Sequence, residues 1–303
     1  MRLTSILGPD GPYAALVTDH GRVSIDAIAR RTGTSWPGTV ERLIRDQRLG
    51  ELRTWAAGAE GLLAELAASP TDAVPGDAVP GDTVPGDTVA APLLTRPPKI
   101  LGVGLNYAEH AGDLGETRPD EPATFMKPAT TIIAAGQTIQ VPRQSQRTTG
   151  EAELGLIIGT HCKDVAEKDA PGVLAGVTTI LDMTAEDILQ RNPRFLTRAK
   201  SFDGFLVLGP DLVTMDEIDD IGALEVTTLH DAHPARRNVV ANMLHSPWKL
   251  VAFFSAIMPL EPGDVISTGT PGAVVLADGD TVGCAIPGVG EISCPVRDTK
   301  VPT

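Results

Sequence analysis

A short tandem repeat divides the sequence into two unequal parts. Three pentapeptides ending in Val-Pro-Gly-Asp run from Ala73 to Asp87, and a partial copy follows them. Each unit has a Pro-Gly pair that favours a turn, and none carries enough apolar surface to pack a core. Three pentapeptides are also too few to build a solenoid. We therefore interpret residues 71–96 as a linker that joins a small N-terminal domain, residues 1–70, to a larger domain, residues 97–303.

The N-terminal domain combines two kinds of hydrophobic pattern. Tyr13–Thr18 and Arg22–Ile25 are typical of strands joined by a polar turn. Thr39–Ile44 and Leu52–Leu66 have apolar residues at helical spacing. This mixture predicts a small α/β domain.

The larger domain is predicted to be rich in β-structure. The chain has 31 glycines and 25 prolines, which favours short elements and many turns over a helix bundle. Its clearest helix is Pro247–Ile257, by the spacing of its apolar residues. The pattern therefore predicts a β-rich α+β fold and not an alternating βαβ chain. The predicted strands are Ile100–Val103, Leu154–Ile158, Val173–Leu181, Phe205–Leu208, Leu224–Leu229, Val265–Ser267, Thr281–Cys284 and Ile292–Val296.

Charge and hydropathy exclude two classes of partner. The net charge is −14, and an acidic surface repels the phosphates of nucleic acids. The longest apolar run, Leu250 to Leu260, is interrupted by Ser255 and Pro259 and is far shorter than the roughly 20 residues that a membrane span needs. We therefore expect neither nucleic acid nor a membrane as a partner.

The cysteines and the first residues indicate the compartment. Cys162, Cys284 and Cys294 are odd in number and form no Cys-x-x-Cys pair, which favours reduced thiols. The first residues lack the long apolar stretch of a secretion signal. Both features predict a cytoplasmic protein.

Three acidic residues are candidates for a metal site. Glu151 and Glu153 project to the same face if they lie in a strand, and two adjacent carboxylates repel each other unless a cation lies between them. Asp182 follows an apolar run and can supply a third ligand at a sheet edge. Oxygen ligands favour Mg²⁺, Mn²⁺ or Ca²⁺. The alternatives are a solvated strand edge for the glutamates and a helix N-cap for Asp182.

Two further segments can contribute to catalysis. His110 and Asp113 are one helical turn apart, so the acid can orient the imidazole for base catalysis; the alternative is a structural histidine. Lys200 precedes a predicted strand and can place a cation near an oxyanion, with a surface lysine as the alternative. After a Pro-Gly-Asp turn and a strand, the tight loop Thr268–Pro271 offers N–H groups and hydroxyls to a carboxylate.

The joint order of these motifs resembles the fumarylacetoacetate hydrolase family. The likeness covers roughly residues 97–298, and the N-terminal domain resembles the variable small domain of many members more weakly. The motifs are Asn106-Tyr-x-x-His110, Glu151-x-Glu-Leu154, Asp182-x-Thr-Ala-x-Asp187, Lys200-Ser-Phe-Asp203 and Leu260-x-Pro-Gly-Asp-x-Ile-x-Thr-Gly-Thr-Pro271.

This resemblance implies a fold, a cofactor and a set of site residues. The fold is a mixed β-roll or β-sandwich that forms a homodimer, and the cofactor is Mg²⁺ or Mn²⁺. The implied residues are Glu151, Glu153 and Asp182 as metal ligands, His110, Asp113 and Lys200 as catalytic residues, and Asn106, Tyr107, Thr268, Gly269 and Thr270 as substrate contacts.

Several positions depart from the family pattern. The histidine's usual glutamate partner is Asp113 here, and Glu116 is an alternative partner. Glu186 stands where the family has an arginine, which adds negative charge near the metal. Glu186, together with the replaced hairpin at residues 230–238, motivates a catalytically degenerate binding protein as one reading of the chain.

The family's Asn-Gly-Glu hairpin, with its following glutamine, is also replaced. Residues 230–238 occupy this place, and Arg236 or Arg237 can take over the glutamine's contact to substrate. His230 and His233 offer a second metal site, although a hairpin turn is favoured.

The resemblance implies two reactions on a small β-dicarbonyl or 2-oxo acid. The first is hydrolysis of a C–C bond in an acylpyruvate or other β-dicarbonyl such as fumarylacetoacetate or fumarylpyruvate. The second is decarboxylation of an oxaloacetate-type 2-oxo acid, or isomerisation and decarboxylation of a 2-hydroxyhepta-2,4-diene-1,7-dioate-type acid. Both reactions use a metal to stabilise an enolate, and the sequence does not choose between them.

Overall fold

The computed structural model describes residues 1–68, 89–107 and 120–301. The pentapeptide repeat, together with His110, Asp113 and Glu116, lies outside these residues. The predicted division at the linker therefore stays a prediction.

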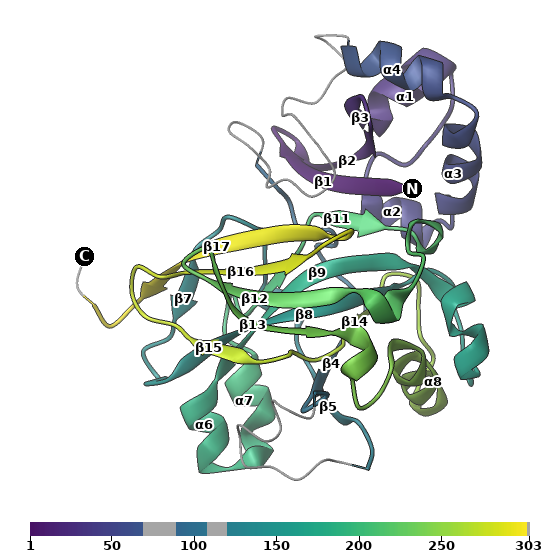
Figure 1. Cartoon of the computed structure of the whole chain (residues 1–303). Helices are drawn as coiled ribbons and strands as arrows, with labels where there is room; N and C mark the ends of the chain where they lie inside the picture. Colours follow the sequence, from purple (N-terminus) through teal and green to yellow (C-terminus); the bar gives the residue numbers. More distant parts are fainter. Residues whose placement is uncertain (69–88, 108–119, 302–303) are drawn as a thin grey trace.

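Three antiparallel strands and four short helices form the N-terminal part (Figure 1). The strands expected over Tyr13–Thr18 and Arg22–Ile25 are confirmed. The helical structure expected over Leu52–Leu66 is confirmed, although the chain breaks at Gly58 and forms two helices. The elements are β1 (Arg2–Gly8), β2 (Gly11–Thr18), β3 (Gly21–Ser24), α1 (Ile25–Thr32), α2 (Val40–Arg45), α3 (Leu49–Ala57) and α4 (Glu60–Ala68).

The N-terminal strands continue into the sheet of the larger domain. Strand β1 pairs with β2 on one side and with β11 (Asp211–Val213) on the other, so that Leu3 lies opposite both Leu16 and Leu212. These leucines are buried in one core with the helices. The small N-terminal part is therefore an extension of the main sheet.

The main sheet has 12 strands among the described residues. Its central path runs β3-β2-β1-β11-β9-β8-β14-β4-β5, while β10 pairs with β9 and β6, and β15 pairs with β8. Most pairs are antiparallel, but β14–β4 and β10–β6 are parallel. The remaining strands are β4 (Ile100–Gly104), β5 (Ala123–Met126), β6 (Ile132–Ile133), β8 (Thr148–Ile158), β9 (Leu174–Ala185), β10 (Leu206–Leu208), β14 (Val265–Ser267) and β15 (Ala273–Val275).

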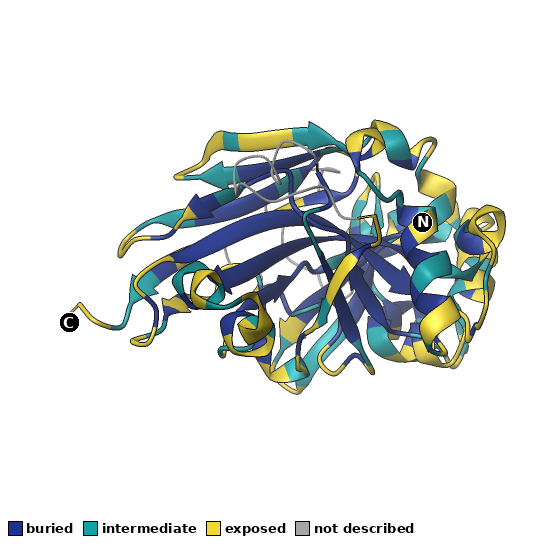
Figure 2. Cartoon of the chain, turned by 90° about the horizontal axis from the view of Figure 1, so that it is seen from below, coloured by how far each residue is buried: buried dark blue, intermediate teal, exposed yellow. Residues whose placement is uncertain are grey.

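A second sheet of five strands packs against β8 and β9. Buried strands run through the centre, whereas helices and turns carry the exposed residues (Figure 2). The two mixed sheets confirm the predicted β-rich fold. The order of the second sheet is β13 (His233–Val239), β12 (Glu225–His230), β16 (Thr281–Ile286), β17 (Gly290–Asp298) and β7 (Ile139–Val141).

Short helices connect the strands. The helix expected over Pro247–Ile257 is confirmed with these bounds. Within the described residues no helix is long and apolar enough to span a membrane. The helices are α6 (Glu186–Arg191), α7 (Leu196–Lys200), α8 (Pro247–Ile257), η1 (Ala129–Thr131), η2 (Glu167–Val173), η3 (Pro193–Phe195), η4 (Met215–Glu217), η5 (Ile221–Ala223) and η6 (Val240–Asn242).

Candidate active site

The long antiparallel pair β8–β9 positions three acidic residues. Ala152 and Leu154 of β8 belong to the core between the sheets, so alternation turns Glu151 and Glu153 to the other face. Asp182 lies directly opposite Glu151 on β9. Because β9 continues to Ala185, the expectation that Asp182 ends a strand is wrong, as is the helix N-cap alternative.

These residues form an acidic triad, which we define as Glu151, Glu153 and Asp182. Each offers an oxygen atom, and the three oxygen atoms lie within 4.8 Å of one another. The residues are 8%, 2% and 0% exposed, which rules out a solvated strand edge. Three converging oxygens at this spacing fit a hard divalent cation, whose bonds to oxygen are roughly 2.0–2.6 Å long. The triad therefore has the donor set of a Mg²⁺ or Mn²⁺ site.

Two buried lysines lie beside the triad. Lys200 donates to Glu151 Oε2 at 3.0 Å and to Asp182 Oδ2 at 2.7 Å. Lys127, which directly follows β5, donates to Asp182 Oδ1 and to the carbonyl of Met183. Lys200 is thus buried as expected for a site residue, whereas Lys127 was missed. It is the only lysine between Lys99 and Lys163, but nothing in its local pattern sets it apart.

The pKa values of Glu153 and Asp182 show which carboxylate of the triad is least stabilised by the two lysines. Burial raises the pKa of Glu153 to about 8, with Asp182 and Glu151 adding to the effect and Lys200 opposing it. Burial also acts against ionisation of Asp182, but Lys127 and Lys200 outweigh it and hold that pKa below its usual range. A cation would therefore relieve the unfavourable charge at Glu153 most.

The two lysines are tuned in opposite directions. Burial lowers the pKa of Lys127 to about 8, although the carboxylate of Asp182 opposes the change. Burial acts in the same direction on Lys200, but Asp182, Glu151 and Glu153 outweigh it and raise its pKa. Lys200 is thus a fixed positive charge, while Lys127 is able to release a proton near neutral pH.

Hydroxyl and amide donors orient the glutamates. Glu153 accepts hydrogen bonds from Ser267 Oγ at 2.5 Å and from the N–H of Gly269 at 2.8 Å. Glu151 accepts from the hydroxyls of Thr184 at 2.8 Å and Thr149 at 3.2 Å. Such contacts fix the carboxylates for a metal.

The loop after β14 therefore binds a carboxylate of the protein itself. Its Gly269 N–H contacts Glu153, while Thr268 donates its hydroxyl to the carbonyl of Leu154 at 2.8 Å. The hydroxyl of Thr270 is 3.1 Å from the carbonyl of Gly272. A substrate contact by Thr268, Gly269 or Thr270 remains a proposal.

Asn106 ties this loop to a neighbouring segment. Its amide donates to the carbonyls of Thr268 at 2.8 Å and His245 at 3.0 Å, and its oxygen accepts from the N–H of His245 at 2.8 Å. Gly269 has a φ of 96°, and a Cβ there would lie 2.8 Å from Asn106 Cβ. Asn106 thus holds the loop in place.

Tyr107 is fully buried next to Asn106, and its hydroxyl has no hydrogen-bond partner among the residues that the structure describes. Burial raises its pKa, and the charge of Glu153 adds to the effect. The hydroxyl is therefore a free donor close to the triad.

The hairpin predicted over residues 230–238 is confirmed. Asp231 and Ala232 adopt left-handed conformations between β12 and β13. Arg236 pairs with Thr228, whose hydroxyl donates to the carbonyl of Gly272 at 3.0 Å. A Cβ on Gly272 would lie 2.7 Å from both Cγ and Cδ of Arg236. Arg236 therefore packs against the loop that holds Glu153.

The hairpin also carries a second group of possible ligands, the hairpin cluster of His230, Asp231 and Asp280. Their ligand atoms again lie within 4.8 Å of one another. His230 Nε2 is 2.9 Å from Asp280 Oδ2, and the side chain of His230 is 34% exposed. His233 is not a member of this cluster.

Fold and site together define a two-sheet β-rich protein with a buried centre of three carboxylates and two lysines. The chain belongs to the fumarylacetoacetate hydrolase family: residues 99–297 match the family model described as "Fumarylacetoacetate (FAA) hydrolase C-terminal". The resemblance carried by the sequence motifs is thereby confirmed. Members of this family are enzymes.

Individual relatives support this assignment. An uncharacterised protein from Archaeoglobus fulgidus is 40% identical over 195 residues, which cover 64% of this chain and 76% of the relative. The structure of 5-carboxymethyl-2-hydroxymuconate delta-isomerase from Mycobacterium smegmatis is 30% identical with a TM-score of 0.71 and covers 99% of both chains. Maleylpyruvate hydrolase from Sphingobium sp. SYK-6, in complex with manganese(II) and pyruvate, is 27% identical with a TM-score of 0.74 and covers 98% of this chain and 99% of its own.

Proposed function

We propose that this chain is a divalent-metal-dependent hydrolase that cleaves a C–C bond in an acylpyruvate or other β-dicarbonyl of the fumarylacetoacetate or fumarylpyruvate type. The observation that carries the proposal is the burial of Glu151, Glu153 and Asp182 around one point beside Lys127 and Lys200. The manganese and pyruvate held by the maleylpyruvate hydrolase support it.

The charge of the site suits an anionic substrate. Three carboxylates and two ammonium groups leave a formal charge of −1, which a divalent cation changes to +1. Bound Mg²⁺ or Mn²⁺, with Ca²⁺ as a further candidate, supplies Lewis-acid stabilisation of negative charge on substrate oxygens. A 2-oxo carboxylate then meets a positive, water-poor site, in which electrostatic attraction is stronger than in water.

The protein groups divide the remaining work. Lys200 holds a proton and a positive charge beside the oxygens at which negative charge develops. His110, oriented by Asp113 or Glu116, takes a proton from the water that attacks the remote carbonyl. Tyr107 offers its hydroxyl, which has no partner within the described parts of the chain, to a substrate oxygen.

The alternative reaction is decarboxylation of an oxaloacetate-type acid or isomerisation and decarboxylation of a longer dioic acid. The similarity to the delta-isomerase from Mycobacterium smegmatis favours it. His110→Ala separates the two readings, because only hydrolysis needs an activated water. A hydrolase loses nearly all turnover in this variant, whereas a decarboxylase keeps a measurable part.

The second alternative, a catalytically degenerate binding protein, rested on the added charge of Glu186 and on the replaced hairpin at residues 230–238. This carboxylate pairs with Arg147 at 2.8 Å, and its charge is therefore compensated at the start of α6. The observation weakens that alternative.

The test is turnover of oxaloacetate, acetylpyruvate, fumarylpyruvate and a fumarylacetoacetate analogue, with Mg²⁺, with Mn²⁺ and with chelator. Metal-dependent loss of the diketone absorbance supports the hydrolase. Turnover of oxaloacetate alone supports the decarboxylase. Failure to bind either metal at millimolar concentration refutes both and favours the binding protein.

Arg236 is proposed as the contact to the far carboxylate of a dicarboxylic substrate. It packs on Gly272 and has no acidic partner among the described residues. Arg236→Gln should raise the KM for fumarylpyruvate about tenfold and leave the KM for acetylpyruvate, which lacks that carboxylate, unchanged. Arg237→Gln is the matched control, since its side chain lies on the other face of β13.

We also propose that the enzyme is a cytoplasmic homodimer. The three cysteines are buried and free, as in a reducing compartment. Ile257 and Val275 are large apolar side chains left 56% and 42% exposed, which a second subunit can cover. Sedimentation of the pure protein tests the dimer.

A further inference from the structure

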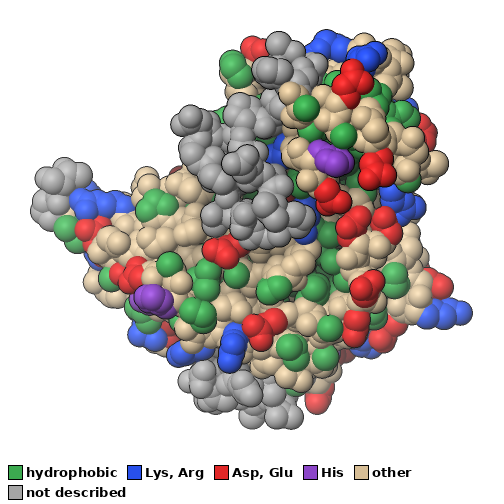
Figure 3. Space-filling view, turned by 45° about the horizontal axis from the view of Figure 1, so that its top comes forward, with side chains coloured by type: hydrophobic (Ala, Val, Ile, Leu, Met, Phe, Trp, Pro, Cys, Tyr) green, Lys and Arg blue, Asp and Glu red, His purple; other side chains and the backbone are tan. Residues whose placement is uncertain are grey.

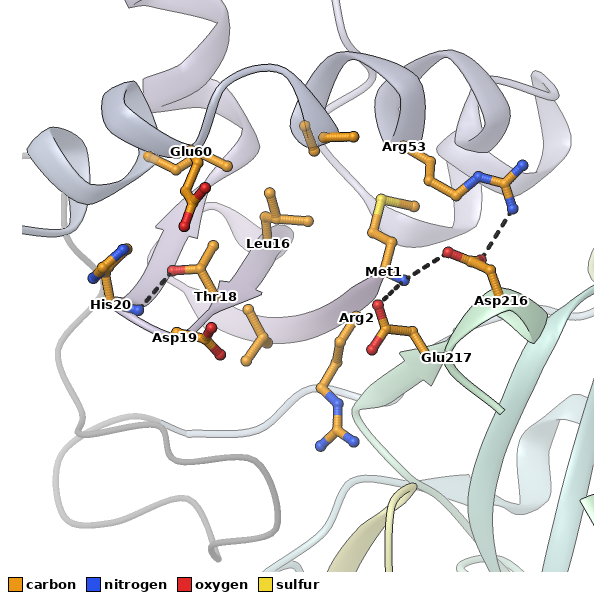
Figure 4. Close-up of a pocket in the computed structure, with 14 residues that line it drawn as sticks. Met1, Arg2, Leu16, Thr18, Asp19, His20, Arg53, Glu60, Asp216 and Glu217 are labelled. Carbon is orange, nitrogen blue, oxygen red and sulfur yellow. Dashed lines mark hydrogen bonds and ion pairs between the residues drawn. The ribbon is translucent and has the colours of Figure 1, made fainter. Parts of the chain in front are cut away.

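A hollow lies where the N-terminal part meets the larger domain, between β2, α3, α4 and η4 (Figure 4). Its charged groups pair with one another. The N-terminal ammonium of Met1 contacts Glu217 at 2.6 Å, and Arg53 contacts Asp216 at 3.0 Å, as the dashed lines in Figure 4 show. Further acidic side chains gather at this boundary in Figure 3. These ion pairs join the two parts of the fold, whereas the residues that set the geometry of the acidic triad lie at the loop after β14.

The peptide bond between Thr268 and Gly269 is held at both of its polar groups. Its carbonyl oxygen accepts a hydrogen bond from Asn106 Nδ2 at 2.8 Å. Its N–H donates to Glu153 Oε2 at 2.8 Å. A trans peptide is planar, with its C=O and N–H pointing in opposite directions, so fixing the carbonyl also fixes the direction of the N–H. Asn106 therefore determines where Glu153 finds this donor.

The same peptide has a second orientation that the backbone permits. Gly269 has a φ of 96°, in the left-handed region that side chains rarely adopt. A half turn of the peptide would move residue 269 to a negative φ, which every residue type adopts. The half turn would also direct the Thr268 carbonyl towards Glu153, where one oxygen dipole repels a carboxylate. The hydrogen bond from Asn106 opposes this half turn.

Asn106 is itself firmly held. The side chain is fully buried, its second amide hydrogen donates to the carbonyl of His245 at 3.0 Å, and its oxygen accepts the N–H of His245 at 2.8 Å. The residue before it, Leu105, has a φ of 58°, which is strained for a residue with a side chain. Such strain persists only where the surrounding contacts outweigh it, and it is common at functional sites. Both amide hydrogens are engaged, so Asn106 has none to donate to a substrate.

We propose that Asn106 is a positioning residue of the metal site. It keeps the Thr268–Gly269 peptide turned so that its N–H holds Glu153 in the orientation of a ligand. This inference rests on the proposed function, because it takes Glu153 as a ligand of Mg²⁺ or Mn²⁺. It deepens that function by giving Asn106 a role towards the metal in place of a contact to substrate.

The first test is hydrogen exchange in the metal-free protein, followed by NMR. In Asn106→Ser the shorter side chain ends before the Thr268 carbonyl, so the peptide is released. The amide of Gly269 should then exchange at least about tenfold faster than in the parent, while the amides of β8 keep their protection. Ser255→Ala is the matched control: it removes two buried hydrogen bonds, with Val165 and Ala252, from helix α8. Exchange at Gly269 should not change in this control.

The second test is the affinity for Mn²⁺, measured by titration calorimetry. Asn106→Ser should weaken Mn²⁺ binding about tenfold, because a ligand loses its orienting donor. Ser255→Ala should leave the affinity unchanged. At saturating Mn²⁺ the KM for acetylpyruvate should stay within about twofold of the parent value in both variants, since neither side chain contacts the substrate.

Gly269→Ala acts on the same peptide from its other end, and it serves if Asn106→Ser does not fold. Its Cβ would lie 2.8 Å from Asn106 Cβ, at a φ that disfavours side chains. The substitution should therefore turn the peptide and weaken Mn²⁺ binding about tenfold. The double variant with Asn106→Ser should be no weaker than either single variant, because both substitutions break the same contact.

Three results would overturn the proposal. The first is unchanged exchange at Gly269 and unchanged Mn²⁺ affinity in folded Asn106→Ser. The second is a raised KM with unchanged Mn²⁺ affinity, which would make Asn106 a substrate contact. The third is additive losses in the double variant, which would separate the effects of the two residues. Absence of Mn²⁺ binding in the parent would instead refute the proposed function, and the exchange measurement, made without metal, distinguishes that failure from a peptide that Asn106 does not hold.

Discussion

The acidic triad and the hairpin cluster have the same spacing but different surroundings. In both, possible ligand atoms lie within 4.8 Å of one another. The triad is buried against Lys127 and Lys200 on the central strands, whereas the hairpin cluster lies partly exposed at a turn. Exposed acidic groups keep their hydration, so they gain little from a cation. Burial, more than proximity, therefore separates a metal site from a surface cluster.

Hydrogen bonding sharpens the same difference. In the hairpin cluster, Asp231 accepts from the N–H of Thr281 at 2.9 Å, and Asp280 accepts from that of Ala277 at 2.8 Å. These hydrogen bonds stabilise turns, so the presence of Asp231 and Asp280 at these positions is explained without a metal. The triad has hydroxyl and amide donors as well, yet burial still raises the pKa of Glu153 to about 8. Of the two clusters, only the triad has a carboxyl group, Glu153, whose ionised form would be stabilised by an added cation.

The largest effect is expected from Asp182→Asn. This carboxylate contacts both lysines and is fully buried. Its loss should lower metal affinity at least about 100-fold and abolish metal-dependent turnover. It should also cost about 3–5 kcal/mol of stability, because the buried Lys127 loses the carboxylate that it contacts and Lys200 keeps only Glu151. Calorimetry with Mn²⁺ and chemical unfolding measure the two effects.

Glu153→Gln is the companion variant in case Asp182→Asn does not fold. It removes a ligand without leaving a lysine unpaired. A folded protein that still binds Mn²⁺ with unchanged affinity would contradict the assignment of the triad.

Lys200→Met should change metal affinity and turnover in opposite directions, each by less than Asp182→Asn does. The ammonium group competes with a metal for Glu151 and Asp182. Its removal should tighten Mn²⁺ binding but reduce turnover about 100-fold, because the charge beside the developing oxyanion is lost. Weaker Mn²⁺ binding, with the fold intact, would show that Lys200 supports the ligands instead of competing with the metal.

Lys127 should show a pH-dependent effect of intermediate size. Its pKa of about 8 lies close to neutrality. Lys127→Met should therefore reduce turnover about tenfold and flatten the pH–rate profile between pH 7 and 9. Lys127→Arg is the control, since arginine stays charged over this range. An unchanged profile in the methionine variant would assign Lys127 a purely structural role.

The metal-free protein should lose stability as pH rises. The folded-state pKa of Glu153, about 8, lies above the ordinary value of 4.5, so the folded state holds a proton that the unfolded state has released. Stability therefore falls between these two pH values. The Tm of the apo protein should drop by roughly 5 °C from pH 5 to pH 8, and saturating Mn²⁺ should remove part of this drop. Glu153→Gln should flatten the curve.

The smallest effect is expected at the hairpin cluster. His230→Ala and Asp280→Asn remove two of its three possible ligands. Turnover should stay within about twofold, and stability within about 0.5 kcal/mol. Mass spectrometry of the native protein should show one Mn²⁺ per chain in the parent and in both variants. A second ion that disappears from the variants would mean that exposure does not exclude a metal site.

Local patterns predicted the parts of the site that one strand defines. Alternation along β8 placed Glu151 and Glu153 on one face, and β14 has the predicted bounds. Asp182 was identified by its motif but misplaced, because a carboxylate inside a strand ordinarily signals an edge. Lys127 and Lys200, which come from distant segments, compensate the buried charge of Asp182. No local sequence pattern predicts these two ion pairs.

Contacts between distant segments account for what was missed. Lys127 contacts Asp182, which is 55 residues further along the chain. Strand β1 pairs on its second edge with residues 211–213. Leu52–Leu66 has continuous helical spacing, yet Gly58 ends α3 before α4 begins. The spacing of apolar residues predicts that a segment is helical, but it predicts the residue at which a helix ends less reliably.

The pairing of β1 with β11 has a consequence for synthesis of the chain. Strand β1 leaves the ribosome before its partner β11, which emerges some 200 residues later. At about 5–20 residues per second, β1 waits for ten seconds or longer with one edge unpaired. An edge of this kind is a template for pairing with other chains. Refolding yield should therefore depend on protein concentration, and nascent chains that end before residue 211 should be the most prone to aggregate.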